Sequence, residues 1–186
     1  MFAKVCNWIE LKRKKASFGR NLKIHGRVRL HGHGKFSIGD NCIITSSSHF
    51  NPADGSSETH FSTKEKGLLF IGNNVGISNS AITASTCVQI DDNVLIGSGC
   101  MISDTDHHEI RLQDRINHVE NIACAPVHIC SGVFVGARCI ILKGVTIGKN
   151  SVIGAGSVVA KSVPENQIWA GNPAVFIKCI EQEEIK

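Results

Sequence analysis

Two aspartates and two histidines lie within five residues of one another in segment 103–126, SDTDHHEIRLQDRINHVENIACAP. A histidine ring is largely neutral at physiological pH and can take a proton from a hydroxyl group. A carboxylate on one ring nitrogen fixes the tautomer that exposes the other nitrogen. Asp104 or Asp106 is the candidate carboxylate, and His107 or His108 is the candidate base. This spacing predicts general-base catalysis; the alternative is a charged surface loop with solvated histidines.

The elements that must position this segment follow from a repeat with a period of six residues. An aliphatic residue recurs without a break at Ile129, Val135, Ile141, Ile147, Ile153 and Val159. The fifth place of each hexad is small or β-branched. The same spacing joins Ile71 to Ile77 and runs from Ile90 to Ile102, and it is looser between Ile24 and Ile44. The repeat therefore fills most of the chain.

A period of six matches neither an α-helix nor the simple alternation of a strand, but it fits short strands joined by tight corners. One aliphatic side chain then points inward on each side, and three sides make a triangular coil. Stacked coils bury a column of aliphatic residues and need caps at both ends. The chain has 23 Ile and 15 Val against 8 Leu, which favours strands. We therefore expect an all-β solenoid with short helical or irregular terminal caps.

The repeat becomes polar just after Ile102. In this register Asp106 takes the fifth place, which is normally small and apolar, and His107 takes the sixth, at a corner. Burying a carboxylate there costs stability unless the carboxylate is paired, and the adjacent imidazole is its natural partner. Catalysis is the simplest compensation for that cost.

Composition narrows the class of protein. The 186 residues, 42% of them hydrophobic, suffice for one domain with a real core. No apolar run is long enough to span a membrane and the Lys-rich start lacks a signal peptide's features, so we expect a cytoplasmic protein. The eight cysteines contain no C-x-x-C pair, and four of them occupy fifth places as small hydrophobes: Cys42, Cys87, Cys100 and Cys139. We expect reduced thiols and no metal.

Five further histidines have no motif around them and are expected to be exposed strand or loop residues: His25, His31, His33, His118 and His128. A zinc site like that of the γ-class carbonic anhydrases needs three separated histidines, which the adjacent His107 and His108 do not supply. In the Ser- and Thr-rich stretch 45–70, His49 or His60 is a candidate for a substrate lid, the alternative being a flexible insert.

Five segments, in this order, carry a resemblance to a known family: IGNNVGISNS, IDDNVLIGSG, SDTDHHEI, ILKGVTIGKNSVIGAGSVV and IWAGNPAVFIK. Over roughly residues 22–178 the chain resembles the hexapeptide-repeat acyltransferase superfamily, and most closely the sugar O-acetyltransferases of capsule, O-antigen and exopolysaccharide synthesis. The resemblance implies a left-handed parallel β-helix, a homotrimer with active sites between subunits, and acetyl-CoA as co-substrate.

The resemblance also implies roles for particular residues. The family's catalytic histidine maps onto His107 by register, whereas the D-x-D-x-H pattern of close relatives selects His108. The residues implied along acetyl-CoA are Ala137, Ala155, Ala160, Lys161 and Asn172. Those implied near the acceptor or the groove are Asn79, Phe134 and Trp169, the last of which is equally an apolar plug.

The expected organisation has three parts: a basic cap over 1–21, a β-helix over 22–163 with insertions at about 45–70 and 103–126, and a C-terminal cap over 164–186. In the first part, Phe2, Val5, Cys6 and Ile9 have helical spacing and precede four basic residues. This segment is expected to cap the solenoid, and it also suits peripheral contact with an anionic membrane. No nucleic-acid-binding module accompanies the charge.

The predicted function is transfer of acetyl from acetyl-CoA to a sugar hydroxyl of a polysaccharide precursor, oligosaccharide or nucleotide sugar. The alternatives keep the mechanism and change the acceptor to the amine of an amino sugar nucleotide or to a small molecule such as serine or a xenobiotic. A third reading, a non-catalytic scaffold, stays open because a fold does not fix a function.

Overall fold

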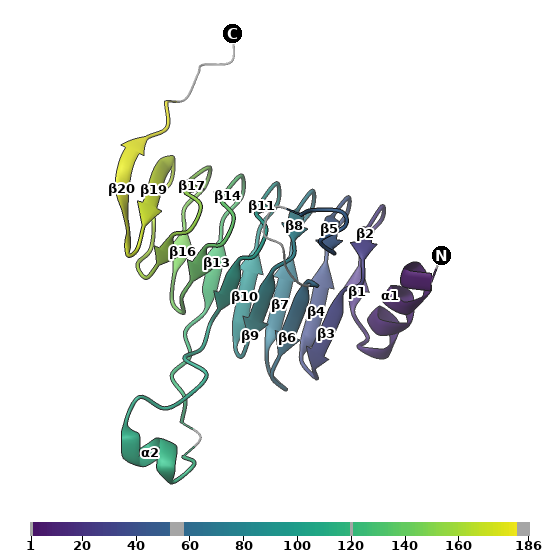
Figure 1. The fold of residues 1–186 in the computed structure, drawn as a ribbon, viewed down its shortest axis with the longest axis horizontal. Coiled ribbons are helices and arrows are strands. Elements are labelled where there is room, and N and C mark those ends of the chain that lie inside the picture. Colours follow the sequence, from purple (N-terminus) through teal and green to yellow (C-terminus); the bar gives the residue numbers. More distant parts are fainter. Residues whose placement is uncertain (1, 53–57, 120, 182–186) are drawn as a thin grey trace.

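The computed structural model describes residues 2–52, 58–119 and 121–181. Three parallel sheets form the sides of a prism, and successive strands of the chain pass from one sheet to the next (Figure 1). Sheet A contains β1 (Ser17–Phe18), β4 (Lys35–Ile38), β7 (Leu68–Ile71), β10 (Cys87–Ile90), β13 (Val127–Ile129) and β16 (Thr146–Ile147).

Sheet B contains β2 (Lys23–Gly26), β5 (Ile43–Ser46), β8 (Gly76–Ser78), β11 (Leu95–Ile96), β14 (Phe134–Val135), β17 (Val152–Ile153), β19 (Gln167–Gly171) and β20 (Ala174–Cys179). Sheet C contains β3 (Arg29–Gly32), β6 (His60–Thr63), β9 (Ala81–Ala84), β12 (Met101–Ser103), β15 (Ile140–Ile141) and β18 (Val158–Val159). Among the strands that the structure describes, every neighbouring pair is parallel except β19 and β20.

The hexad aliphatics form the core in exact stacking order. Ile90 lies beside Ile129, which lies beside Ile147, and each of these side chains is almost fully buried. The fifth-place thiols of Cys42, Cys100 and Cys139 are also buried, and burial raises the pKa of the Cys42 thiol. Cys87 is only partly buried. The column therefore consists of small and branched side chains, as the period of six predicted.

A ladder of asparagines lines one corner of the prism. Asn21, Asn41, Asn74 and Asn93 all have positive φ, between 57° and 61°. Asn21 donates to Asn41 at 2.9 Å, Asn41 to Asn74 at 3.2 Å and Asn74 to Asn93 at 3.1 Å. Asparagine tolerates the left-handed region better than other residues with a Cβ. The ladder thus makes one sharp turn repeatable from coil to coil.

We expect Asn74→Ala to lower the free energy of unfolding by about 1–2 kcal/mol. Alanine tolerates positive φ less well than asparagine, and the substitution removes two side-chain hydrogen bonds of the ladder. Urea denaturation followed by circular dichroism measures this change. Asn74→Gly relieves the backbone cost of positive φ but still loses the two side-chain hydrogen bonds. Its free energy of unfolding should therefore lie between those of the parent and Asn74→Ala. Equal losses in the two variants would contradict the backbone explanation.

The first insertion is shorter than expected. β5 ends at Ser46 and β6 begins at His60, so the excursion occupies about 47–59, of which 53–57 lie outside the described residues. Residues 60–63 and 68–71 return to the coils because Phe61 and Leu69 supply the inward side chains. His60 therefore lies on a strand, where its Nδ1 is 3.2 Å from Nε2 of His31, and His49 is exposed in the loop.

The second insertion projects from the prism as an arm that carries the short helix α2 (Leu112–Ile116), drawn in green in Figure 1. At the far end of the stack, β19 continues sheet B and β20 folds back against it. The solenoid therefore extends into the segment that was expected to be only a cap. Among the described residues, neither helix is long or apolar enough to cross a lipid bilayer.

Helix α1 (Phe2–Arg13) closes the N-terminal end, but through a different face from the one predicted. Leu11 is buried, and buried Asn7 donates to Gly26 O at 2.9 Å and accepts from Val28 N at 3.1 Å. Val5 and Ile9 are each 52% exposed, and the side chain of Phe2 lies outside the described part. The polar Asn7 lies on the inner face of the helix because its side chain forms hydrogen bonds with backbone groups of the first coil.

Candidate active site

His107 lies where the arm leaves β12, and its backbone has a φ of +63°. Its Nε2 is 3.0 Å from Oγ of Ser103, and its backbone N–H donates to Thr105 Oγ1. A non-glycine residue at positive φ costs stability, and such residues gather at functional sites when their surroundings hold them in place. The ring itself is exposed. His107 is thus fixed at its backbone and accessible at its side chain.

The Ser103 hydroxyl limits the proton arrangement on His107. Ser103 Oγ donates to the carbonyl of Thr105 at 3.1 Å and accepts from Thr105 N. A hydroxyl has one proton, so while it is given to Thr105 O, the contact with His107 requires an N–H on Nε2. Nδ1 is then the ring nitrogen with a free lone pair. Turning the hydroxyl toward the ring reverses these roles.

Asp104 does not orient a histidine, contrary to the sequence prediction. Its side chain is completely buried, and Oδ1 accepts from Ser85 N at 2.6 Å. Oδ2 accepts from Thr86 N, Thr86 Oγ1 and Cys87 N at 2.6–2.8 Å. The carboxylate thus accepts four hydrogen bonds from the preceding coil and, within the described residues, makes none with a histidine. Asp104 therefore anchors the start of the arm.

Asp106 was predicted to pair with the neighbouring imidazole, and this is also wrong for the chain as described. Its Oδ1 accepts instead from Lys143 Nζ at 2.7 Å. Lys143 was not among the residues predicted from the sequence, although the hexad register contained the information. Ile102 lies beside Ile141, so the residues after β15 lie directly next to the base of the arm. Asp106 Oδ2 is buried and has no hydrogen-bond partner within the described residues.

Two small pockets flank the histidines. One, of about 290 Å³, is lined by both His107 and His108 together with Arg115 and His118 of the arm. The other, of the same size, is lined by His108 but not His107, and by Asp106 and Glu109. One oxygen of Glu109 is, like Asp106 Oδ2, buried without a partner in the described residues. Both histidines therefore stay candidates for the base.

Four of the five residues implied along acetyl-CoA lie at the two edges of sheet C. Ala137 and Ala155 occupy the same corner in successive coils, between sheets B and C. The approach is close there, since a Cβ on Gly136 would meet Ala155 N at 2.6 Å. Ala160 and Lys161 follow β18 at the opposite edge, on the side from which the arm departs, and both are exposed. Asn172 is exposed in the turn between β19 and β20.

The three residues implied near the acceptor do not converge on His107 in this chain. Asn79 is buried; its Oδ1 accepts from Ser47 N and its Nδ2 donates to Asn51 O, so it ties down the first insertion. Trp169 packs against the core from β19, as an apolar plug would. Phe134 is 45% exposed on β14. We correct the assignment of Asn79, because a 2% exposed amide is closed to an acceptor.

The comparisons with known proteins agree with this architecture. A family model described as bacterial transferase hexapeptide (six repeats) matches residues 126–161. The chain is 33% identical over 149 residues to the galactoside O-acetyltransferase of Lactococcus lactis subsp. lactis (strain IL1403), covering 80% of this chain and 65% of that protein. The chain thus carries the bacterial transferase hexapeptide repeat over residues 126–161 and is similar to hexapeptide-repeat acetyltransferases.

Two further proteins extend the comparison. The galactoside O-acetyltransferase of Escherichia coli (strain K12) is 38% identical over 109 residues, which are 57% of this chain and 51% of that protein. A solved galactoside acetyltransferase in complex with coenzyme A has a TM-score of 0.61 and 26% identity, covering 97% of this chain and 80% of that one. The expected left-handed parallel β-helix is thereby confirmed. The chain spans about half to two thirds of the length of these curated relatives.

Proposed function

We propose that the protein is an acetyl-CoA-dependent O-acetyltransferase that acetylates a sugar hydroxyl of a polysaccharide precursor, oligosaccharide or nucleotide sugar. The observation that carries this proposal is the accessible histidine pair at the base of the arm. Buried Asp104 anchors the start of this arm to the preceding hexapeptide coil. Relatives named galactoside O-acetyltransferase and a related structure holding coenzyme A support the reaction class.

The chemistry is a direct transfer. The acceptor oxygen attacks the thioester carbonyl while His107 or His108 takes the hydroxyl proton. The tetrahedral intermediate then expels the CoA sulfur, which receives that proton from the imidazolium, so an ester and free CoA thiol form without an acyl-enzyme.

We also propose that the working unit is a homotrimer. The arm exposes Ile110, Leu112 and Ile116, with 76%, 64% and 58% of each side chain accessible, which is costly for a segment that stays in water. A second copy of the chain is a suitable cover for these side chains. Phe134 is on sheet B, whereas the arm leaves the coils between sheets C and A, so a Phe134 that packs against the arm would come from another copy. Acetyl-CoA would then lie between subunits, along Ala137, Ala155, Ala160 and Lys161.

The decisive experiment measures thiol release from acetyl-CoA with a panel of sugars, nucleotide sugars and oligosaccharides. Release that depends on a hydroxyl sugar supports the proposal. Release that depends on an amino sugar nucleotide, serine or a xenobiotic amine assigns one of the other acceptors. Retained acetyl-CoA binding with no release for any acceptor, including lipid-linked glycans, would leave a binding scaffold.

We further propose that the protein acts in the cytoplasm, with helix α1 resting on the anionic inner face of the membrane. Val5, Trp8 and Ile9 are each more than half exposed and lie on one face of the helix. Lys12 Nζ lies 5.8 Å from the Trp8 ring centroid, and Lys4 and Lys15 are also exposed. Apolar anchors bordered by cations suit a surface of acidic lipids.

We expect the protein to co-sediment with phosphatidylglycerol vesicles but not with phosphatidylcholine vesicles, and Val5→Asp to reduce the bound fraction several-fold. Val175→Asp is the matched control, because Val175 is 55% exposed and Val5 is 52% exposed, at opposite ends of the stack. Equal losses for both variants, or binding that is insensitive to added salt, would contradict docking through α1.

A further inference from the structure

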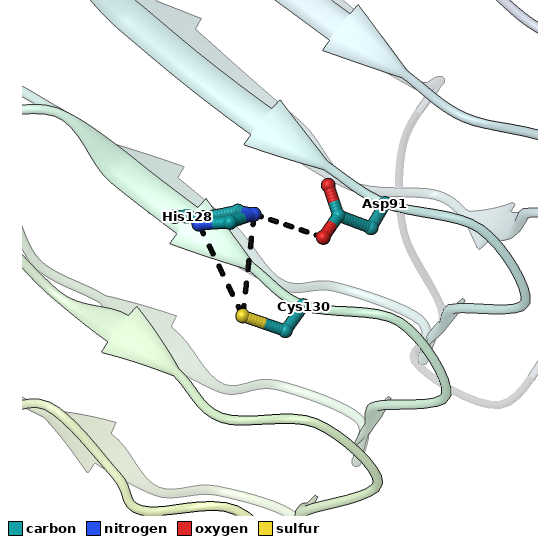
Figure 2. Close-up of side chains that lie close together, drawn as sticks. All are labelled: Asp91, His128 and Cys130. Atoms are coloured by element: carbon teal, nitrogen blue, oxygen red, sulfur yellow. Dashed lines mark hydrogen bonds and ion pairs between the residues drawn. The ribbon is translucent and has the colours of Figure 1, made fainter.

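A cluster of three metal-binding side chains lies on sheet A, away from the histidine pair. Asp91 directly follows β10, His128 lies within β13, and Cys130 directly follows β13. The register pairs Ile90 with Ile129, so Asp91 and Cys130 continue it side by side on adjacent coils. His128 and Cys130 are two residues apart and therefore share the outer face of the sheet. Figure 2 shows the three side chains converging.

The donor atoms are close enough for one ion. Asp91 Oδ2 is 2.9 Å from His128 Nε2, and Cys130 Sγ is 3.9 Å from Nδ1 and 4.0 Å from Nε2 of that ring. One donor atom from each residue lies within 4.8 Å of the others. Ligands bound to a single tetrahedral Zn²⁺ at about 2.0–2.3 Å lie roughly 3.3–3.8 Å apart. The present spacings of 2.9, 3.9 and at most 4.8 Å lie on both sides of that range, so binding an ion requires the three side chains to rotate to it.

The surroundings support the cluster. The other oxygen of Asp91 accepts a 2.8 Å bond from Gln89 Nε2, which holds the carboxylate in place. Such outer contacts orient the ligands of protein metal sites. The side chains of His128 and Asp91 are 38% and 27% exposed, so an ion can enter from solvent and water can complete its coordination.

The donor set also selects the ligand class. A thiolate with an imidazole favours zinc-class transition metals over Mg²⁺ and Ca²⁺, which prefer oxygen ligands. A nucleophilic thiol activated by His128 fits less well. The sulfur is almost equally far from both ring nitrogens and faces neither as a nucleophile faces its base.

We propose that Asp91, His128 and Cys130 form a binding site for a zinc-class divalent ion that braces the β-helix across the arm. Asp91 precedes the arm by chain order and His128 follows it, 37 residues later. Asp104 holds the arm to the beginning of β10 through Cys87 N, and the ion would join the carboxyl-terminal ends of β10 and β13. The site is separate from the proposed acetyl transfer.

Cobalt(II) titration of the untagged, metal-stripped full chain tests the proposal, because a thiolate ligand gives a charge-transfer band in the near ultraviolet. We expect one Co²⁺ per chain, displaced by Zn²⁺, and an affinity at least about tenfold weaker in Cys130→Ser and in Asp91→Asn. Zn²⁺ should raise the melting temperature of the parent by about 3 °C or more and leave Cys130→Ser unchanged.

Cys179→Ser is the matched control, because Cys179 is an exposed thiol outside the cluster. Circular dichroism of each metal-free variant establishes that it is folded before titration. Loss of the cobalt band in Cys179→Ser rather than Cys130→Ser would overturn the proposal. So would parent-like affinity in folded Cys130→Ser and Asp91→Asn. None of these readouts depends on acetyl transfer, so this proposal and the proposed function fail independently.

Discussion

The His107→Asn substitution is expected to lower kcat/KM for acetyl transfer by about 10²- to 10⁴-fold, the usual contribution of a general base. His107 is the stronger candidate because its backbone is fixed at positive φ and its ring contacts Ser103. Asparagine is preferred to alanine here because it tolerates the left-handed region, so the variant keeps the fold while losing the base. Thiol release at several acetyl-CoA concentrations measures the change.

The neighbouring His108→Ala variant is the control, and its loss should be much smaller. Unchanged acetyl-CoA affinity in His107→Asn would show that the chemical step, and not binding, is affected. The reverse pattern, with a large loss only in His108→Ala, moves the base to His108 as the D-x-D-x-H pattern suggests. Full activity in a variant lacking both histidines would refute the general-base mechanism.

The Asp104→Ala substitution is expected to lower the free energy of unfolding by about 3 kcal/mol or more. The substitution removes the acceptor of the backbone N–H groups of Ser85, Thr86 and Cys87, of which that of Ser85 is buried, and each buried unsatisfied group costs about 1–3 kcal/mol. It also leaves a cavity at a fully buried position. For a chain of this size the melting temperature should fall by roughly 6–12 °C. Differential scanning calorimetry measures the shift.

Asp106→Ala supplies the comparison for Asp104. Its carboxylate makes one partly exposed ion pair, with Lys143, so its removal should cost less. An Asp104→Ala protein with the parent's melting temperature but no acetyl transfer would contradict the anchoring role and restore the role in histidine orientation that the sequence predicted.

The hexad aliphatics could be predicted from sequence because each satisfies a local rule: one inward side chain per short strand, repeated every six residues. Ile90, Ile129 and Ile147 stack as that rule requires. The same regularity explains why the solenoid and its projecting arm between β12 and β13 were predictable.

The contacts of the site depend on register between coils, which the period alone does not specify. Asp104 bonds to residues one coil earlier, and Asp106 to Lys143 one coil later, so neither partner is near it in sequence. Asp91 and His128 are likewise brought together only by strand pairing. At α1, the hydrophobic spacing indicated Val5 and Ile9, but backbone groups of the first coil needed the amide of Asn7.

The reversal of β20 has a consequence for how copies of this protein behave at high concentration. A stack of parallel coils would otherwise end in open strand edges onto which another stack could add, and such edges drive fibre growth. Within the described residues, α1 contacts β2 and β3 at one end, and antiparallel β20 covers β19 at the other. In sheet B, therefore, one end of the stack lies against α1 and the other ends in an antiparallel strand, which disfavours end-to-end addition of a second copy through this sheet.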